Sequence, residues 1–411
     1  MKKRILSLSM MFVMTIASLV FLTGCSRVTN FATANVSGQG GSTVISGDYL
    51  YYISKGSTDR TLSGEALKGY GIYKTKIDKD GTPTGEATLV YEGLVGHKNS
   101  SLYVFGDYVY FTTPSRKRNS SGEYLTDRTS FCRVKTDGKG YELIHTTDTK
   151  DALLYTYYYE NDEQLYLVVN EGSLLYSIDL ASKKFDRTTI SEETVSVVFS
   201  ATCGVGQNAD KYIFYTEQPA KNYATNVGYN VYKANAKGDK SESISSGENV
   251  TLIEVKDGYL YFAIDSYIYR TTTQGGLTTH QEVSYGIYDS YIITNDGGIL
   301  LVNTDQKETW YFNWTTGTMK ENCVLGTADY KILVESGDYV YAKYTDNKIY
   351  KFALSQTRQT PAKVVDEVAT GMTDDLTIEV VGNTVYYYTE KKVSNEVGKE
   401  VSEYTLKWKK M

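Results

Sequence analysis

Short runs of aromatic and β-branched residues recur along the chain, separated by polar turns. In residues 257–270 two such runs flank a polar turn at Asp265 and Ser266, which predicts a tight β-hairpin. Successive strand residues point to opposite faces, and here both Leu260 and Tyr261 are large and apolar or aromatic. We therefore expect both faces of this hairpin to be covered by neighbouring sheets.

The same hairpin repeats, so internal repeats are the main signal in the sequence. Most copies have one more apolar run before them and a less regular run after them, which gives four strands per unit and a period of roughly 40 to 60 residues. We predict an all-β fold, a β-propeller of four-stranded antiparallel blades. Eight blades is the favoured count, and seven is the alternative because the unit around Ile299 is irregular. A right-handed solenoid is the second choice of fold.

The last unit, residues 376–411, has only three predicted strands. We expect an N-terminal strand within residues 30–36 to close the ring beside residues 403–408, because closure removes an exposed sheet edge. The predicted organisation is a signal peptide at residues 1–24, a tether with the closing strand at 25–41 and the propeller at 42–411.

The N-terminus has the features of a secretory signal. A basic start at residues 2–4 precedes an uncharged apolar run at 5–22 and the sequence Leu-Thr-Gly-Cys, which ends at Cys25. This ending resembles a bacterial lipobox, and the resemblance implies cleavage before Cys25 and acylation of its thiol. An uncleaved membrane anchor is the alternative. We expect a lipid-anchored protein on the extracytoplasmic face of the cell membrane, in a Gram-positive cell since Ser26 follows the cysteine rather than Asp.

Composition narrows the function. The formal net charge is −6, and loss of the three basic residues at positions 2–4 would make it −9, which argues against general nucleic-acid binding. Tyr is frequent, at 39 residues, and Pro is scarce, at 4, as expected for strands. No long stretch after Gly24 has apolar residues at helical spacing. A two-lobed α/β solute-capture lipoprotein is therefore the poorest fit.

Cysteine and histidine give no sign of a disulfide framework or a metal site. Apart from Cys25, the chain has Cys132, Cys203 and Cys323, each in a different repeat, and we expect them to be buried small apolar residues. The three histidines are too widely spaced for zinc or a transition metal: His97, His145 and His280. Asp-Gly pairs, as at residues 137–138 and 296–297, are typical of hairpin turns rather than calcium ligands.

Residues 260–270 read Leu-Tyr-Phe, five further residues and Ile-Tyr-Arg, with a variant at 340–351. This pattern resembles the YWTD-type propeller repeat of low-density-lipoprotein-receptor-related proteins and of bacterial lipoproteins with a related domain of unknown function. The resemblance covers nearly the whole mature chain and implies a propeller with a binding role. No copy has a complete Tyr-Trp-Thr-Asp and that family usually has six blades, so no binding residue is carried over.

The sequence contains no nucleophile elbow, Walker loop or His-Glu-x-x-His motif. We expect no catalytic residue, no metal and no cofactor. The alternative is a polysaccharide-acting propeller enzyme, which would need carboxylates from distant blades to meet in the central channel. The aromatic stripe of Trp310, Phe312 and Trp314 lies on one face of one strand and is interpreted as core between blades, with sugar stacking as the alternative.

Long loops indicate where a partner binds. In a propeller, loops between second and third strands share one face with the connections between blades, and here residues 54–70, 113–129 and 390–401 form long loops in units 1, 2 and 8, with a fourth at 217–228. The candidate binding residues form a basic sector on an acidic chain: His97, Lys98, Arg116, Lys117, Arg118 and Arg128. We expect a surface-anchored, non-catalytic lipoprotein that binds a protein or an anionic wall polymer through these loops. The alternative reading of the sector is a set of solvated loops.

Overall fold

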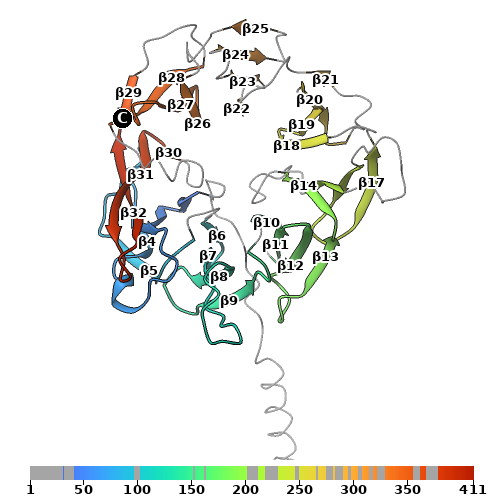
Figure 1. The fold of residues 1–411 in the computed structure, drawn as a ribbon. Coiled ribbons are helices and arrows are strands. Elements are labelled where there is room, and N and C mark those ends of the chain that lie inside the picture. The colour runs from blue at the N-terminus through green and yellow to red at the C-terminus, as the bar shows by residue number, and fades with distance from the viewer. Residues whose placement is uncertain are drawn as a thin grey trace, which may run out of the picture.

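The protein folds into a ring of eight four-stranded antiparallel sheets (Figure 1). The computed structural model describes residues 31, 41–96, 102–150, 153–161, 163–200, 212–217, 230–245, 250–264, 267–274, 281–282, 290–294, 298–303, 308–313, 318–321, 329–354, 362–366 and 378–411. The predicted β-propeller is confirmed, and the irregular unit around Ile299 forms a complete sheet. Within these residues, no helix has the length and apolar character needed to cross a membrane.

Strands in each blade are given from the centre of the ring outward. Blade 1 contains β1 (Thr43–Ser46), β2 (Tyr49–Ile53), β4 (Gly71–Lys76) and β5 (Thr88–Glu92), with β3 (Lys55–Ser57) and the 3₁₀-helix η1 (Gly64–Leu67) between β2 and β4. Blade 2 contains β6 (Tyr103–Phe105), β7 (Tyr108–Pro114), β8 (Thr129–Lys135) and β9 (Glu142–Thr146). Blade 3 contains β10 (Leu153–Asn161), β11 (Gln164–Glu171), β12 (Leu174–Asp179) and β13 (Arg187–Ser191). Blade 4 contains β14 (Thr194–Phe199), β15 (Ile213–Glu217), β16 (Asn230–Ala234) and β17 (Lys240–Ser245).

The second half of the ring repeats this plan. Blade 5 contains β18 (Val250–Lys256), β19 (Tyr259–Ile264), β20 (Tyr267–Thr272) and β21 (Gln281–Glu282). Blade 6 contains β22 (Ser290–Ile293), β23 (Gly298–Asn303), β24 (Glu308–Asn313) and β25 (Thr318–Glu321). Blade 7 contains β26 (Tyr330–Ser336), β27 (Tyr339–Tyr344), β28 (Ile349–Ala353) and β29 (Ala362–Val365). Blade 8 contains β30 (Glu379–Val381), β31 (Thr384–Ser394) and β32 (Glu400–Lys410), and its outer strand is β3.

Both faces of the β19–β20 hairpin are covered, as predicted. Leu260 and Phe262 pack in one cluster with Phe214 of blade 4, and neither side chain is exposed to solvent. Tyr261 points the other way and packs with Ile299 of blade 6. Alternating strand residues thus hold adjacent blades together through separate apolar clusters, which explains why the strands have no polar face.

Ring closure uses a different strand from the one predicted. The outer strand of blade 8 is β3, which pairs with β32 from Lys55↔Thr405 to Ser57↔Glu403. The prediction that residues 30–36 take this place is wrong in its residues, although the closing strand does come from the N-terminal part of the propeller. Phe31 is in no strand, and the other residues of that range lie outside the described part of the chain.

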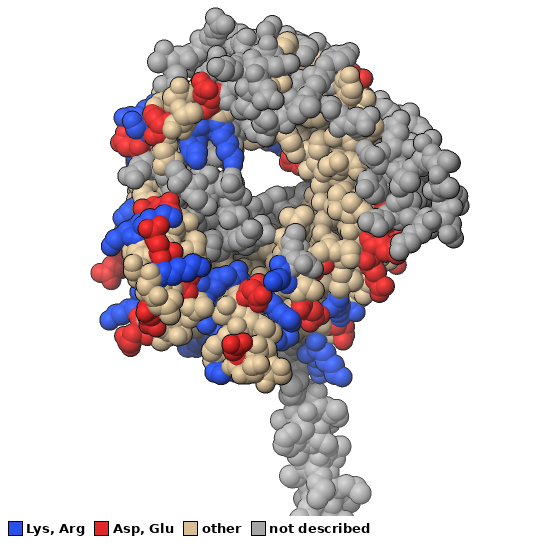
Figure 2. Space-filling model, in the orientation of Figure 1, with Lys and Arg blue, Asp and Glu red and all other residues tan. Residues whose placement is uncertain are grey.

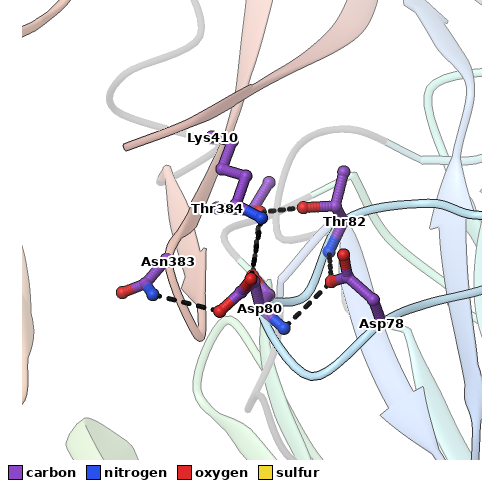
Figure 3. Close-up of polar contacts among 6 residues, drawn as sticks. All are labelled: Asp78, Asp80, Thr82, Asn383, Thr384 and Lys410. Atoms are coloured by element: carbon purple, nitrogen blue, oxygen red, sulfur yellow. Dashed lines mark hydrogen bonds and ion pairs between the residues drawn. The ribbon is translucent and has the colours of Figure 1, made fainter.

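A second contact closes the same seam on the opposite end of the blades (Figure 3). In the loop between β4 and β5, Asp78 Oδ1 accepts hydrogen bonds from the backbone N–H groups of Asp80 and Thr82, each at 2.9 Å. Asp80 then reaches blade 8, where its Oδ2 lies 2.7 Å from Lys410 Nζ and its carbonyl accepts the N–H of Asn383 at 3.0 Å. Blade 1 is therefore bonded to blade 8 through both β3 and this loop.

Cys132 is a buried residue of blade 2, as predicted. Its side chain is fully buried, its Sγ lies 3.1 Å from Tyr141 Oη, and burial raises the pKa of its thiol to about 11. The thiol is thus neutral and protected at ordinary pH. Cys203 and Cys323 lie outside the described residues.

Candidate functional site

Four of the predicted binding residues lie in one described loop, residues 115–128 between β7 and β8: Arg116, Lys117, Arg118 and Arg128. The loop connects the second and third strands of blade 2 and so lies on the face that the sequence indicated. The remaining members of the predicted set, His97 and Lys98, and the predicted lipidation site Cys25 lie outside the described residues.

The tip of this loop is a small folded hairpin. Arg118 and Tyr124 form an isolated β-bridge, and Asn119 Oδ1 accepts hydrogen bonds from the N–H groups of Ser121 and Glu123, each at 2.9 Å. The guanidinium carbon of Arg118 lies 4.2 Å from the centre of the Tyr124 ring, and its Nη2 donates to Tyr124 Oη at 2.8 Å. An asparagine turn and a cation–π contact therefore hold the basic side chain in place.

Arg60, which sequence reasoning did not single out, fastens this loop to blade 1. Its Nε donates to the carbonyl of Thr126 at 2.5 Å, and its Nη2 donates to the carbonyl of Arg128 at 3.0 Å. In return, Arg116 donates to the carbonyl of Leu62 in the blade 1 loop. Each arginine satisfies backbone acceptors of the other loop, so the two loops form one surface.

The third predicted loop, residues 390–401, is a strand extension. β31 continues to Ser394 and β32 starts at Glu400, which leaves a turn of residues 395–399. The prediction of a long loop is therefore wrong. Residues such as Lys391 and Lys392 are polar and exposed, yet they continue the paired strands of the β31–β32 hairpin. This turn still meets blade 1, since Asn395 Nδ2 donates to Asp59 Oδ2 at 3.0 Å. We call residues 54–70, 115–128 and 395–399 the platform.

Asp59 is the junction of the platform between blades 1 and 8. Its residue is only 8% exposed, and its Oδ1 accepts hydrogen bonds from the N–H of Thr61 at 2.9 Å and from Thr61 Oγ1 at 2.6 Å. Burial acts to raise the pKa of Asp59, but hydrogen bonds from Thr61 and Asn395 outweigh burial and leave it below its usual value. The folded structure therefore favours the charged carboxylate.

Replacing Asp59 with alanine should destabilise the protein by about 1–3 kcal/mol at neutral pH, because Asn395 and Thr61 lose their acceptor. The control is Glu65→Ala, which removes an exposed carboxylate from the same loop. Since the pKa of Asp59 is lowered by folding, its contribution is present above the unfolded value near 4 and is lost as the pH falls through the folded value. Thermal unfolding at pH 7 and pH 3 measures this, and equal losses in the two variants would count against the junction.

Three neighbouring cations are exposed on the platform, among exposed acidic side chains that include Glu123. Arg116, Lys117 and Arg118 are all exposed, and none forms an ion pair with another described residue. The nearby Glu123 carboxylate accepts from Asn119 Nδ2 at 3.0 Å. Arg128 differs from the other three, because it is only half-exposed at the base of the loop. The structure thus brings three predicted cations together near the tip of one loop and places the fourth, Arg128, at its base. We call the part of the loop that carries Arg116, Lys117 and Arg118 the finger.

The aromatic stripe of β24 is core. Trp310 and Phe312 are partly buried and pack against a cluster that contains Tyr261, Ile268 and Ile299 from blades 5 and 6. The prediction of core between blades is confirmed for these two residues. Trp314 lies outside the described residues.

Figure 2 shows that the ring is hollow at its centre. Three inner strands around it carry glutamates: Glu254 on β18, Glu335 on β26 and Glu379 on β30. Lys256 Nζ lies 3.6 Å from Glu335 Oε2, and Glu379 Oε1 accepts the N–H of Thr43 at 3.1 Å. Burial raises the pKa of Glu254, and it raises that of Glu379 to about 8. The contacts of Glu335 and Glu379 join inner strands of different blades, so these two carboxylates help to hold the blades together.

The described histidine and Asp-Gly turn also have structural partners. His145 Nε2 lies 3.0 Å from Tyr176 Oη, and burial together with the charge of Arg187 lowers its pKa. Asp137 Oδ1 accepts the N–H of Lys139 at 3.0 Å, and Gly138 has φ +83°, which confirms this pair as a turn. In the described part of the chain, no group of three His, Cys, Asp or Glu side chains could hold a metal ion.

No family model and no curated protein matches this chain. Among solved structures it is similar to BamB from Moraxella catarrhalis, with 12% identity and a TM-score of 0.44 over 86% of this chain and 98% of that one. It is also similar to apo AztD from Citrobacter koseri, with 13% identity and a TM-score of 0.42 over 81% and 86% of the two chains. A chain of a nidogen/laminin complex is 12% identical, with a TM-score of 0.29 over 49% and 89%. The propeller assignment rests on the eight sheets themselves, and no residue is carried over from these structures.

Proposed function

We propose that this protein is a surface-anchored, non-catalytic β-propeller lipoprotein whose platform binds an acidic partner, either a protein surface or an anionic wall polymer. The observation that carries the proposal is the finger of Arg116, Lys117 and Arg118, exposed on loops that are bonded across three blades. The YWTD-type resemblance, with its implied binding role, is consistent with this proposal but is not its basis.

The order of the platform favours binding. Loops that are held in one arrangement before binding lose less conformational entropy when a partner docks. Arg118 is stacked on Tyr124, which is itself 48% exposed, so a planar guanidinium and an aromatic ring are presented side by side. Guanidinium groups bind carboxylates and phosphates through paired hydrogen bonds, and the ring adds contact area. The finger therefore suits an anionic partner better than a neutral one.

The proposed lipid anchor would hold the propeller close to the membrane. Phe31 is only 1% exposed and packs in the aromatic core that includes Tyr103, Tyr110 and Phe131. Cys25 lies six residues before Phe31, a span of at most about 20 Å in an extended chain. Acylation at Cys25 would thus hold Phe31, and the core around it, within about 20 Å of the lipid.

Replacing Arg116, Lys117 and Arg118 together with serine should reduce partner recovery at least tenfold, because three charges leave the platform. The measurement is a crosslinking pull-down from intact cells of the native host, with Cys25→Ser as the unanchored copy. The matched control is Lys183→Ser with Lys184→Ser, which removes exposed charges from the loop between β12 and β13 on the opposite face.

A discrete membrane protein, secreted protein or wall polymer that is lost only from the platform variant would support the proposal. Unchanged recovery of every partner by that variant would reject the platform as the binding site. Thermal unfolding of the variant should show a loss of at most about 2 kcal/mol, from the Arg116 bond to Leu62 and the Arg118 contact with Tyr124, because Arg60 still fastens the loop to blade 1.

A further inference from the structure

A second surface lies at the far end of blade 8 from the platform. β32 runs from Glu400 to Lys410, but β3 pairs with it only between Glu403 and Thr405. The N–H of Leu406 bonds to the carbonyl of Ser54, the residue just before β3, at 3.0 Å. Residues before Ser54 belong to β2 of blade 1 and do not pair with β32. The edge of β32 beyond Leu406 is therefore not covered by β3.

Backbone geometry shows what this edge offers. Main-chain groups of an antiparallel strand point alternately to its two neighbours. Since Leu406 bonds toward β3, the N–H and C=O groups of Trp408 and Lys410 point to that same side. Met411, with opposite parity, bonds to the carbonyl of Asn383 beside β31 at 2.8 Å. Within the described part of the chain, no main-chain hydrogen bond fills the open side of Trp408 or Lys410.

An apolar cavity of about 140 Å³ lies next to this edge, between blades 8 and 1. Its walls are mainly apolar and aromatic side chains from both blades: Leu50, Tyr52, Thr75, Pro83, Gly85, Ala87, Tyr386, Leu406 and Trp408. Trp408 is 48% exposed, so the cavity opens to solvent beside the indole. A protein cavity of about 150 Å³ accommodates benzene, so this one has room for a single aliphatic or aromatic side chain.

The charges on the strand complete the pattern. Leu406 and Trp408 face blade 1, where Leu406 packs with Leu50. Lys407 and Lys409 therefore point to the other face of the sheet, and both are exposed. A strand added along this edge would place one side chain in the cavity and its two neighbours beside these lysines.

We propose that the open edge of β32 binds an extended peptide segment of a partner protein as an added strand, with an apolar side chain in the cavity and acidic residues on either side. Backbone groups supply affinity and the cavity with its flanking lysines supplies sequence preference, as in other strand-addition complexes. A second copy of this chain is disfavoured as the occupant, because pairing of identical edges would bring Lys407 and Lys409 against the same lysines.

The test uses the full-length protein in detergent and a fluorescent heptapeptide of alternating Glu and Leu, read by fluorescence polarisation. A peptide of the same composition, with all Glu before all Leu, controls for charge alone. Lys410→Pro removes the outward N–H without touching the β31 ladder, since proline is tolerated at an open strand edge. Lys410→Ala is its matched control, because both variants lose the ion pair with Asp80. Trp408→Ala removes one wall of the cavity.

We expect the alternating peptide to bind, the block peptide to bind at least tenfold more weakly, and both Lys410→Pro and Trp408→Ala to weaken binding at least tenfold relative to Lys410→Ala. Substituting serine for Arg116, Lys117 and Arg118 should leave this binding unchanged, which separates the edge from the platform. Equal binding by Lys410→Pro and Lys410→Ala, or equal binding of the two peptides, would overturn the proposal. So would a dimer, seen by sedimentation velocity, that Lys410→Pro dissociates, because a second copy would then occupy the edge.

Discussion

Replacing Gly81 with alanine is expected to lower the free energy of unfolding by about 2–5 kcal/mol, because it adds left-handed backbone strain to a steric clash. Gly81 has φ +77°, a conformation that costs other residues free energy. A Cβ built on Gly81 would lie 2.2 Å from the carbonyl oxygen of Val381 in blade 8. Backbone cannot give way as a flexible side chain can, so the loop or the blade must move.

The seam explains why this one methyl group has a large effect. Gly81 sits between Asp80 and Thr82, in the loop that bonds to Asn383 and Lys410 (Figure 3). A shift of that loop would break these contacts between the first and last blades together. Loss of these contacts would leave β3 to hold blade 1 to blade 8, which weakens the closure of the ring.

The variant Gly47→Ala separates the cost of left-handed backbone strain from the cost of the steric clash. Gly47 has φ +58°, and a Cβ there would have no other atom within 4 Å. Its replacement should therefore cost only the backbone term, about 1–2 kcal/mol. Equilibrium unfolding in urea measures both variants. If Gly81→Ala is no more destabilising than Gly47→Ala, the contact across the seam does not constrain the ring.

Glu379→Gln is expected to make the protein more stable in mildly alkaline solution. Glu379 Oε1 accepts the N–H of Thr43 at 3.1 Å and lies against Gly41, and burial raises the pKa of Glu379 to about 8. An acid whose pKa is raised by folding favours the folded state when protonated. Stability is therefore lost as the pH rises from the unfolded value near 4.3 through the folded value.

Glutamine keeps an oxygen acceptor for Thr43 and carries no charge at any pH. The variant should match the unaltered protein at pH 4 and exceed its melting temperature by several degrees at pH 9. The control Glu65→Gln, at an exposed carboxylate, should show no such gain. Thermal unfolding across this pH range is the measurement. A Glu379→Gln variant that is less stable than the unaltered protein at pH 9 would show that the charged carboxylate is needed at the inner seam.

Regular alternation and aromatic content made the blades predictable from sequence. The hairpin predicted within residues 257–270 is confirmed by the pairing of Ile264 with Tyr267. The fourth strand expected near residues 88–91 is β5, Thr88–Glu92. Middle strands such as β19 are predictable because most of their residues are buried on both faces, so that local pattern and tertiary packing demand the same residues. β5 is largely exposed, and its place in the repeat indicated it.

The closure and the platform depend on contacts that local pattern does not encode. β3 is only Lys55–Ser57, too short to show alternation, and it pairs with residues nearly 350 positions later in the chain. The extension of the β31–β32 hairpin is polar on its exposed residues, so it resembled a loop. Arg60 carried no signal of its own, because its partners are backbone carbonyls of another blade. The exposed cations, in contrast, could be predicted, because Arg116, Lys117 and Arg118 are consecutive in the sequence.

The most direct test of the platform as the binding face is site-specific photocrosslinking in intact cells of the native host. A photoreactive phenylalanine derivative at Tyr124 would sit beside Arg118, and the same residue at Lys184 would report on the opposite face. We predict a discrete adduct with a protein or wall polymer from position 124 that is absent from position 184. An adduct from position 184 alone, or none from position 124 in cells where the chemical crosslinking pull-down recovers a partner, would contradict the assignment of this face.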